Sequence, residues 1–345
     1  MNCFRFFSFP ALKSFCITFA LTLACLLLSA HSTLAQDPDE KLTINTSLVQ
    51  LNVGVVDHQG RAVTNLSRSD FKIYEDGVLQ PIASFEPTAA PFSLVLLLDL
   101  SGSTHTFRPT LKQSAYRFLD ALAPDDRVAV VAFNEKTKTL EGFTSDFKKV
   151  AKSIEYADGK GETHFYQALD YALDLLGKEG KRRKAIVVLT DGLDTEMRKQ
   201  DREQAASAHT NEEAIASVKP DASGPLNEVL RAADRQGVTI YPLALPSGDP
   251  KRLPFLDPVL TAIYSSAHAR LQTLADRTGG RLSEIRRLED MGWLYAQVAA
   301  DLRSLYTIAY SPTNTDRTPG RLRSIRIETS SSDLITHTKT GYIAR

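Results

Sequence analysis

One decapeptide carries more structural information than any other part of this 345-residue chain: Leu94-Val95-Leu96-Leu97-Leu98-Asp99-Leu100-Ser101-Gly102-Ser103. Its first half is a continuous apolar run of strand length, which is typical of a strand covered on both faces, as in a parallel sheet. Its second half supplies short polar side chains where that strand ends. The segment therefore predicts a buried strand with a polar loop at its carboxyl end.

The same alternation of apolar strands and helical segments continues over residues 91–304. Further buried strands are predicted at residues 127–133, 185–189 and 238–245, with a short one at 281–285. Helices are predicted at residues 107–122, 147–156, 165–176, 225–235 and 288–304, and one more helix is predicted to end near residue 279. This order indicates an α/β domain, with a mostly parallel central sheet and helices on both faces. Two segments interrupt it. The polar residues 195–224 are expected to form an inserted helix or a mobile lid, and residues 246–259 a proline-rich loop.

Polar residues gather at the predicted strand ends. Asp99, Ser101 and Ser103 follow the first buried strand, Gly161-Glu162-Thr163 precedes a helix, and Leu189-Thr190-Asp191-Gly192 ends the third strand. Because ligands bind where the carboxyl ends of parallel strands meet, we expect these three loops to lie together. The hydroxyls of Ser101, Ser103 and Thr163 suit a hard divalent cation, Mg²⁺ or Mn²⁺, with the carboxylates of Asp99 and Asp191 acting through bound water. Neutral direct ligands leave the ion able to accept a carboxylate from another molecule.

This three-part motif resembles the metal ion-dependent adhesion site of the von Willebrand factor type A (VWA) domain, over about residues 91–304. The resemblance implies that Ser101, Ser103 and Thr163 bind Mg²⁺ directly, with Asp99 and Asp191 just behind them. It also implies a protein partner that offers a Glu or Asp carboxylate to the metal. The insertion at residues 195–224 departs from the family pattern and bears on how open the metal face is.

The segments on either side of the α/β domain are rich in predicted strands, at residues 49–56, 71–74 and 82–85 before it and at 305–310, 322–329 and 334–342 after it. Because three short strands bury too little surface alone, residues 36–90 and 305–345 are expected to pack into one β module; two separate β extensions are the alternative. The motifs at residues 66–71, 74–77 and 340–342 resemble those of secreted VWFA-related proteins of acidobacterial type.

The first 35 residues have the three-part pattern of a secretory signal peptide: Arg5 and Lys13 without an acid, an apolar run over residues 15–30, and small residues placed for cleavage after Ala35. An uncleaved anchor is a weaker alternative because polar residues interrupt the run. A lipoprotein anchored through Cys25 is also weaker, because the run continues past it. All three cysteines lie in this segment, so we expect an exported protein without disulfides or a membrane span.

Charge and motif content exclude several functional classes. With 41 basic and 41 acidic residues, the chain has a formal net charge of zero and no basic footprint of the kind that binds nucleic acid. It lacks a Gly-x-Ser-x-Gly elbow, a phosphate-binding loop, a dinucleotide fingerprint and a His-Glu-x-x-His motif. A hydrolase that activates water with the metal is the remaining enzymatic alternative, with no obvious general base beyond the two aspartates.

Structural roles compete with the metal-site interpretation. Asp99 and Asp191 could be ordinary helix caps or turn residues, and a metal site could persist without a partner. As ligands, His105 and His164 would favour a softer ion such as Zn²⁺. We expect both instead to be loop residues on the binding face or simply exposed to solvent. Asp194 either tunes the site or starts a turn.

The sequence therefore predicts an exported, non-enzymatic protein that binds an acidic group of a protein partner through a metal ion-dependent adhesion site. The periplasm, the cell surface and the medium are all compatible with export. The alternative is a structural or assembly protein of the cell envelope. In that case the α/β core is a scaffold, the metal site is vestigial and the β module makes the contacts.

Overall fold

The computed structural model describes residues 48–59, 61–88, 91–180, 182–249, 251, 257–313, 318 and 320–344. The predicted signal peptide, with its cleavage site and its three cysteines, lies outside the described residues, as does part of the loop 246–259. None of the helices within these ranges combines the length and the apolar character that crossing a bilayer requires.

A six-stranded sheet forms the centre of the α/β domain, in the order β10-β9-β8-β5-β6-β7. Its strands are β5 (Phe92–Asp99), β6 (Arg127–Phe133), β7 (Thr137–Thr144), β8 (Arg183–Thr190), β9 (Val238–Ala244) and β10 (Ser283–Glu284). Neighbouring strands are parallel except for β6 and β7, which are antiparallel. The predicted mostly parallel α/β fold is confirmed. The edge strand β7 is not among the predicted strands, because its partly exposed residues form no apolar run.

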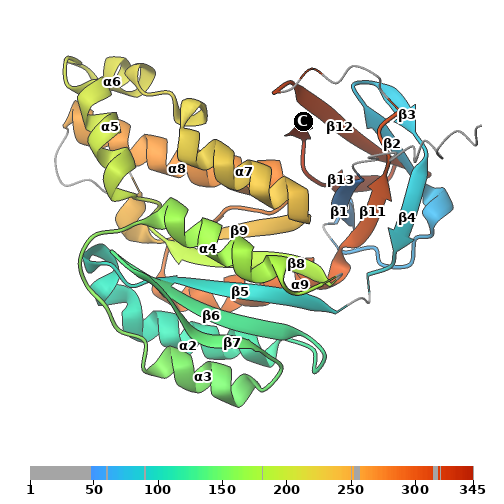
Figure 1. Cartoon of the computed structure of the whole chain (residues 1–345), viewed down its shortest axis with the longest axis horizontal. Coiled ribbons are helices and arrows are strands. Elements are labelled where there is room, and N and C mark those ends of the chain that lie inside the picture. The colour runs from blue at the N-terminus through green and yellow to red at the C-terminus, as the bar shows by residue number, and fades with distance from the viewer. Residues whose placement is uncertain are drawn as a thin grey trace, which may run out of the picture. The chain divides into compact units, whose positions relative to one another are not determined.

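Helices cover both faces of this sheet (Figure 1). Side chains of β5 alternate between the two sides, so that Leu94 and Leu96 pack beneath one helical layer and Val95 and Leu97 beneath the other. The first layer comprises α2 (Arg108–Asp120), α3 (Phe147–Glu155) and α9 (Met291–Ser304), and the second α4 (Phe165–Gly177), α7 (Gly224–Gln236) and α8 (Pro258–Thr278). Because both faces are covered, every residue of β5 is buried, as its apolar run predicts.

Strands from both ends of the chain form two further four-stranded sheets, in the orders β13-β1-β11-β4 and β14-β12-β2-β3. Their strands are β1 (Val49–Asp57), β2 (Phe71–Glu75), β3 (Val78–Gln80), β4 (Ile82–Glu86), β11 (Tyr306–Tyr310), β12 (Leu322–Thr329), β13 (Leu334–His337) and β14 (Gly341–Ile343). β1 pairs with β11 and β13, and β2 pairs with β12. One apolar cluster joins the two sheets and includes Leu51, Ile73, Tyr306 and Ile327.

Residues 334–342, predicted to be β-rich, form two strands, β13 and β14, which belong to different sheets. Lys339 lies in the gap between them and makes a 2.9 Å ion pair with Asp234 of α7. This lysine is buried, so its side chain joins the break between the two strands to the α/β domain.

Residues 195–224 form two helices, α5 (Thr195–Ala205) and α6 (Asn211–Ser217), and the 3₁₀ turn η4 (Pro220–Ala222). Asp201 of α5 and Arg270 of α8 form a buried ion pair with two hydrogen bonds, at 2.6 and 2.7 Å. A small apolar cluster binds α6 to α8 and comprises Ala205, Ala214, Val218 and Ala262. Of the two forms expected for this insertion, the structure shows the helical one, packed on the core.

The two small sheets join the α/β domain at the amino ends of its parallel strands. Arg183, the first residue of β8, donates to the carbonyl oxygens of Leu302 (3.1 Å) and Leu305 (2.8 Å) just before β11. Asn52 of β1 donates to the hydroxyl of Thr239, near the start of β9, at 2.8 Å. The carboxyl ends of the same strands, with the predicted metal loops, form the opposite edge of the sheet.

Candidate metal centre

The five predicted metal-site residues lie on three loops at the carboxyl edge of the sheet. Asp99 ends β5, Ser101 and Ser103 lie at the start of the 3₁₀ turn η3 (Gly102–Phe107), Thr163 precedes α4, and Asp191 follows β8. All are buried except Ser103, which is exposed. The hydroxyl oxygens of Ser101 and Ser103 are 3.1 Å apart. The backbone N–H of Gly102 donates to the carbonyl of Gly161 at 3.2 Å, which joins the first loop to the second.

Asp99 and Asp191 form a buried pair of carboxylates. Asp99 accepts hydrogen bonds from the backbone N–H of Ser101 at 3.0 Å and from the hydroxyl of Thr190 at 2.8 Å. Burial and, next, the neighbouring Asp191 carboxylate raise the pKa of Asp99 to about 7. Burial also raises the pKa of Asp191, although hydrogen bonds from Ser103 and Leu193 oppose this effect. The arrangement therefore disfavours negative charge on both carboxyl groups at once.

The donor set of this edge fits a hard divalent cation. The groups that act most strongly on Asp99 are Asp191, Ser101 and Thr190, none of which is basic. A divalent cation would offset the two negative charges, and hydroxyl and carboxylate oxygens are ligands that Mg²⁺ and Mn²⁺ accept. Within the described ranges, no three His, Cys, Asp or Glu side chains gather into a metal-binding group. A site at this edge would therefore depend on its hydroxyl groups.

Arg108, at the start of α2, holds two of the loops together and is not among the site residues predicted from the sequence. Its guanidinium donates to the carbonyl oxygens of Leu100 (2.9 Å) and Ser101 (3.3 Å). It also donates to the carbonyl of Gly159 and to the carboxylate of Asp158, on the loop that leads to Thr163. No sequence pattern indicates this link, because Arg108 and Asp158 are 50 residues apart and meet only in the fold.

The first two loops approach each other so closely that Gly159 has no room for a side chain. A Cβ atom at this position would lie 2.9 Å from both the Cβ and the carbonyl oxygen of Leu100. Asn134 fixes the second loop from another direction. Its side-chain amide donates to the carbonyl of Lys160 at 2.8 Å, and its backbone carbonyl accepts from the N–H of His164 at 3.0 Å.

Asp194 starts a helix and also links the second loop to the third. Its carboxylate caps α5 by accepting from the backbone N–H groups of Glu196 (3.0 Å) and Met197 (3.1 Å). Its other oxygen accepts from the N–H of Phe165, at the start of α4, at 2.8 Å. The backbone N–H of Thr195 donates to the carbonyl of Thr163 at 2.9 Å. Asp194 is therefore a cap that also helps to position Thr163.

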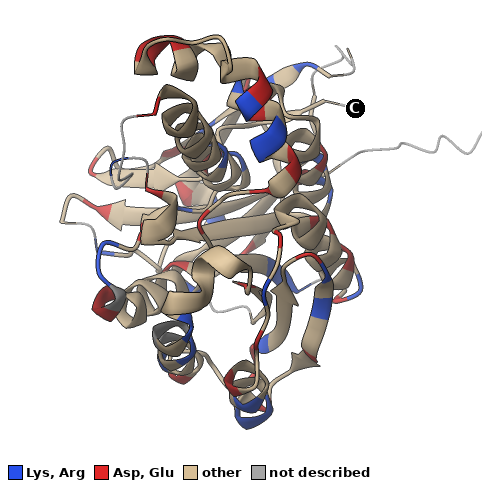
Figure 2. Ribbon diagram, turned by 90° about the vertical axis from the view of Figure 1, so that its left-hand side faces the viewer, with Lys and Arg blue, Asp and Glu red and all other residues tan. Residues whose placement is uncertain are grey.

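The two histidines next to the loops are surface residues. His105 is exposed in η3, and His164 is half-buried, with its Nε2 3.8 Å from the carboxylate of Glu162. Their exposure agrees with the prediction that they are loop residues on this face of the domain. Figure 2 turns this edge of the sheet toward the viewer and shows acidic and basic residues interspersed over it.

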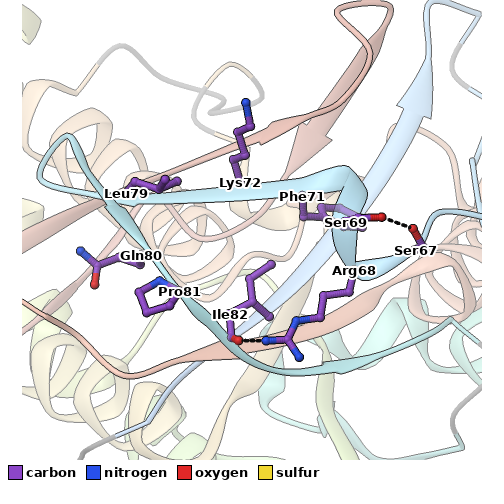
Figure 3. Close-up of a pocket in the computed structure, with 9 residues that line it drawn as sticks. All are labelled: Ser67, Arg68, Ser69, Phe71, Lys72, Leu79, Gln80, Pro81 and Ile82. Atoms are coloured by element: carbon purple, nitrogen blue, oxygen red, sulfur yellow. Dashed lines mark hydrogen bonds between the residues drawn. The ribbon is translucent and has the colours of Figure 1, made fainter.

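A second feature, a wide hollow of about 730 Å³, opens in the β sheets between η2 (Arg68–Asp70), β2 and the β3–β4 corner (Figure 3). Arg68 reaches across it to the carbonyl of Ile82, and the Ser67 and Ser69 hydroxyls lie 2.9 Å apart. Leu79, on the rim, is 56% exposed. Because these polar groups already have partners, the hollow suits a protein contact rather than a metal ion.

Comparison with known proteins identifies the central part of the chain. Residues 94–193, which include all five predicted metal-site residues, match the family described as the von Willebrand factor type A domain. Over 116 residues the chain is 34% identical to the human voltage-dependent calcium channel subunit alpha-2/delta-2, a match that covers 30% of this chain and 10% of that protein. The chain thus spans about a tenth of the length of this curated relative.

Two solved structures are similar in fold. The structure described as von Willebrand factor type A from Catenulispora acidiphila covers 87% of this chain and 74% of that chain, at 12% identity and a TM-score of 0.45. Proximal thread matrix protein 1 from the mussel byssus, solved with a zinc-occupied MIDAS motif, covers 65% of this chain and 48% of that chain, at 15% identity and a TM-score of 0.41. The family match, which runs from β5 to the loop after β8, is the finding that assigns the domain. Residues 94–193 therefore lie in a von Willebrand factor type A domain, a known protein-interaction module.

Proposed function

We propose that this protein binds a protein partner through a divalent metal ion held at the carboxyl edge of its α/β sheet. The observation that carries the proposal is the burial of Asp99 next to Asp191, with hydroxyl groups rather than a basic side chain as the other strong influences on Asp99. Buried charges in proteins are normally paired or coordinate a metal. The presence of a protein-interaction domain over the same residues supports the second half of the proposal.

In this proposal Ser101, Ser103 and Thr163 hold Mg²⁺ directly, while Asp99 and Asp191 hold it through water. Mn²⁺, which prefers similar oxygen ligands, can substitute. When bound, the ion supplies an electrophilic centre for a carboxylate. Ser103 is the exposed member of the set, so a cation beside it can be reached by a Glu or Asp side chain of the partner.

We further propose that the protein is exported and is not an enzyme. Residues 1–35 act as a cleaved signal peptide that delivers the protein to the periplasm, the cell surface or the medium. Residues 91–304 form the VWA domain, and residues 36–90 pack with 305–345 in one β module. VWA domain proteins are generally non-enzymatic, which supports a binding role.

Thermal unfolding tests the metal site directly. At a Mg²⁺ concentration ten times the dissociation constant, a ligand of the native state adds about 1.4 kcal/mol of stability, worth several degrees in a domain of this size. We expect this shift in residues 36–345 and its loss in Asp99→Ala. Asp170→Ala is the matched control, because Asp170 is an exposed carboxylate on α4.

Partner capture tests the rest of the proposal. Once a partner has been identified, EDTA should abolish its binding and added Mg²⁺ should restore it. Binding should be lost in Asp99→Ala and kept in Asp170→Ala. Binding that survives both EDTA and Asp99→Ala would overturn the metal-dependent mechanism. Turnover on a panel of esters, phosphates and peptides would overturn the non-enzymatic role.

A second candidate function, an envelope scaffold whose β module makes the contacts, is favoured by the hollow beside β3. Val78 and Leu79 of this short edge strand are 52% and 56% exposed. Deleting residues 36–90 would not test this role cleanly, because β1 pairs with both β11 and β13. The better test is Leu79→Asp, which should abolish association while Asp99→Ala leaves it intact; the opposite result favours the metal-dependent role.

A further inference from the structure

A second hollow adjoins the candidate metal centre at the same edge of the sheet. It has a volume of about 290 Å³ and lies between the carboxyl ends of β9 and β10 and one face of α8. Its lining includes Leu245, Pro246 and Gly248 after β9, Ile285 after β10, and Ser265 and His268 of α8. From the sequence, residues 246–259 are predicted only to form a proline-rich loop.

The turn η5 (Pro246–Gly248) is a wall shared by this hollow and the metal centre. The hydroxyl of Ser247, in the middle of the turn, donates to the carboxylate of Asp191 at 3.4 Å. The flanking Gly248 packs so tightly that a Cβ atom there would lie 2.2 Å from the carbonyl oxygen of Asp191. A ligand in the hollow would therefore be separated from Asp191 by only one turn of backbone.

The chemistry of the hollow favours an apolar side chain. Leu245 and Ile285, each 2% exposed, form part of its lining together with the buried Ala244. Within its wall, Nε2 of His268 lies 3.2 Å from the carboxylate of Glu284. The charged residues of the lining balance in sign, with two acidic residues, Asp249 and Glu284, and two basic ones, Lys251 and Arg286.

We propose that this hollow receives an apolar side chain, aromatic or leucine-sized, from the same partner segment whose carboxylate reaches the metal. The inference rests on the proposed function and names the partner's recognition chemistry: an acidic residue followed or preceded at short distance by an apolar one. An extended chain advances about 3.3–3.6 Å per residue, so offsets of one to four residues sample separations of about 3–14 Å between the acidic and the apolar residue. The metal then supplies affinity for any carboxylate, and the hollow supplies selectivity.

A peptide series tests this inference on the mature chain. The probes are Ac-Glu-(Gly)n-Phe-NH₂ and the reversed Ac-Phe-(Gly)n-Glu-NH₂, with n from 0 to 3, each beside a matched peptide in which Ala replaces Phe, titrated in Mg²⁺. At one or two spacings we expect the Phe peptide to bind about tenfold or more tightly than its Ala counterpart, as burial of a large apolar side chain provides. Equal affinities at all four spacings, in both orders, would overturn the inference.

Variants of Ser265 test whether the Phe side chain of the peptide binds in the hollow. Ser265→Phe fills the hollow and should remove the advantage of Phe while leaving the affinity of the Ala peptide unchanged. Ser265→Ala, which keeps the hollow open, should retain the advantage. Persistence of the advantage in a folded Ser265→Phe protein would place the apolar contact elsewhere and overturn the inference.

A neutral probe separates failure of the hollow from failure of the metal site. We expect p-cresol, titrated into the ¹⁵N-labelled wild-type protein, to shift backbone amide signals of the lining, such as those of Ile285 and Ser265. This measurement needs no variant and no metal. If no Glu peptide binds in Mg²⁺, the proposed function fails, and the hollow is judged by p-cresol alone. Shifts confined to the lining then support an apolar side-chain site, and their absence overturns it.

Discussion

Two buried carboxylates of the VWA domain have opposite surroundings. Asp201 is 1% exposed, and Arg270 donates a hydrogen bond to each of its oxygens, at 2.6 and 2.7 Å. Asp99 is 0% exposed, and its strongest neighbours are another carboxylate, that of Asp191, and hydrogen-bonding groups without charge. The chain itself neutralises the first carboxylate, whereas in the proposed function an external cation offsets the charge of the second. The first carboxylate belongs to a structural ion pair that fastens the insertion to the core, and the second belongs to the proposed metal site.

The largest effect on stability is expected when the ion pair between Asp201 and Arg270 is broken. Arg270→Ala leaves the Asp201 carboxylate buried without its partner, which typically lowers the free energy of unfolding by about 3–5 kcal/mol. Urea unfolding measures this loss. The stabilisation by Mg²⁺ should persist in the variant under conditions where it is folded, because Arg270 does not belong to the metal centre.

Two further variants sharpen this first comparison. Arg231→Ala, which removes an exposed guanidinium from α7, should change stability by less than about 0.5 kcal/mol. Replacing the pair together, by Asp201→Leu with Arg270→Met, should recover most of the loss, because no unpaired charge remains buried. An Arg270→Ala protein as stable as the wild type would show that the insertion does not depend on this pair.

The next largest effect, on the affinity for Mg²⁺, is expected at Arg108, which positions the metal loops. Arg108→Ala removes the donors that bind the carbonyls of Leu100 and Ser101 to the loop at Gly159. Residues that orient metal ligands typically change metal affinity by about 10–100-fold. The Mg²⁺ concentration at half-maximal stabilisation measures this change. Arg108→Lys should recover only part of the affinity, since an ammonium lacks the planar fork. Unchanged affinity in Arg108→Ala would remove the positioning role.

A smaller effect on stability is expected at the Asp99–Asp191 pair. Its sign should differ between the metal-free and the metal-bound protein. Asp99→Asn removes one of two neighbouring buried charges while keeping a similar shape. The free energy of unfolding of the metal-free protein should rise by about 1 kcal/mol, because an interaction that raises a pKa by one unit costs about 1.4 kcal/mol. The same variant should lose its stabilisation by Mg²⁺. Thermal unfolding with EDTA and with Mg²⁺ gives both values, and a variant destabilised in EDTA would show that the pair is not strained without metal.

The smallest effect on stability is expected at Asp158, the exposed partner of Arg108. Asp158 pairs with Arg108, but its side chain is 81% exposed, whereas that of Arg108 is 8% exposed. Exposed ion pairs contribute little, so Asp158→Ala should change stability by less than about 0.5 kcal/mol and leave the Mg²⁺ affinity unchanged. A large loss in this variant would mean that the carboxylate, rather than the carbonyl contacts, holds the guanidinium in place.

The parts of the fold that local pattern specifies were predicted well. Parallel strands covered on both faces need continuous apolar residues, so β5, β6, β8 and β9 could be recognised from their side chains alone. The edge strand β7 could not, because its partly exposed residues form no apolar run. The break between β13 and β14 could not either, because it involves contacts with residues distant in the sequence. Lys339, for example, finds Asp234 across 105 residues.

The candidate site divides in the same way. Its five oxygen-bearing residues follow strand ends or precede a helix, and parallel topology alone predicts that such loops share one edge. The residues that hold the loops in place have no local signature. Arg108 binds a loop 50 residues away, and the Asn134 side chain bonds one 26 residues away. The hollow beside η5 is equally invisible in the sequence, because its walls come from three separate elements.

The sequence by itself determined the α/β core, the three polar loops and the oxygen chemistry of their side chains, because hydrophobic periodicity and residue type are local properties. Only the tertiary structure decided how those side chains are charged and held. Burial beside Asp191 raises the pKa of Asp99, while a buried Arg270 neutralises Asp201. An aspartate has the same chemistry at both positions. Its desolvation and its neighbours, which only folding creates, make one carboxylate a structural partner and the other a candidate for metal binding.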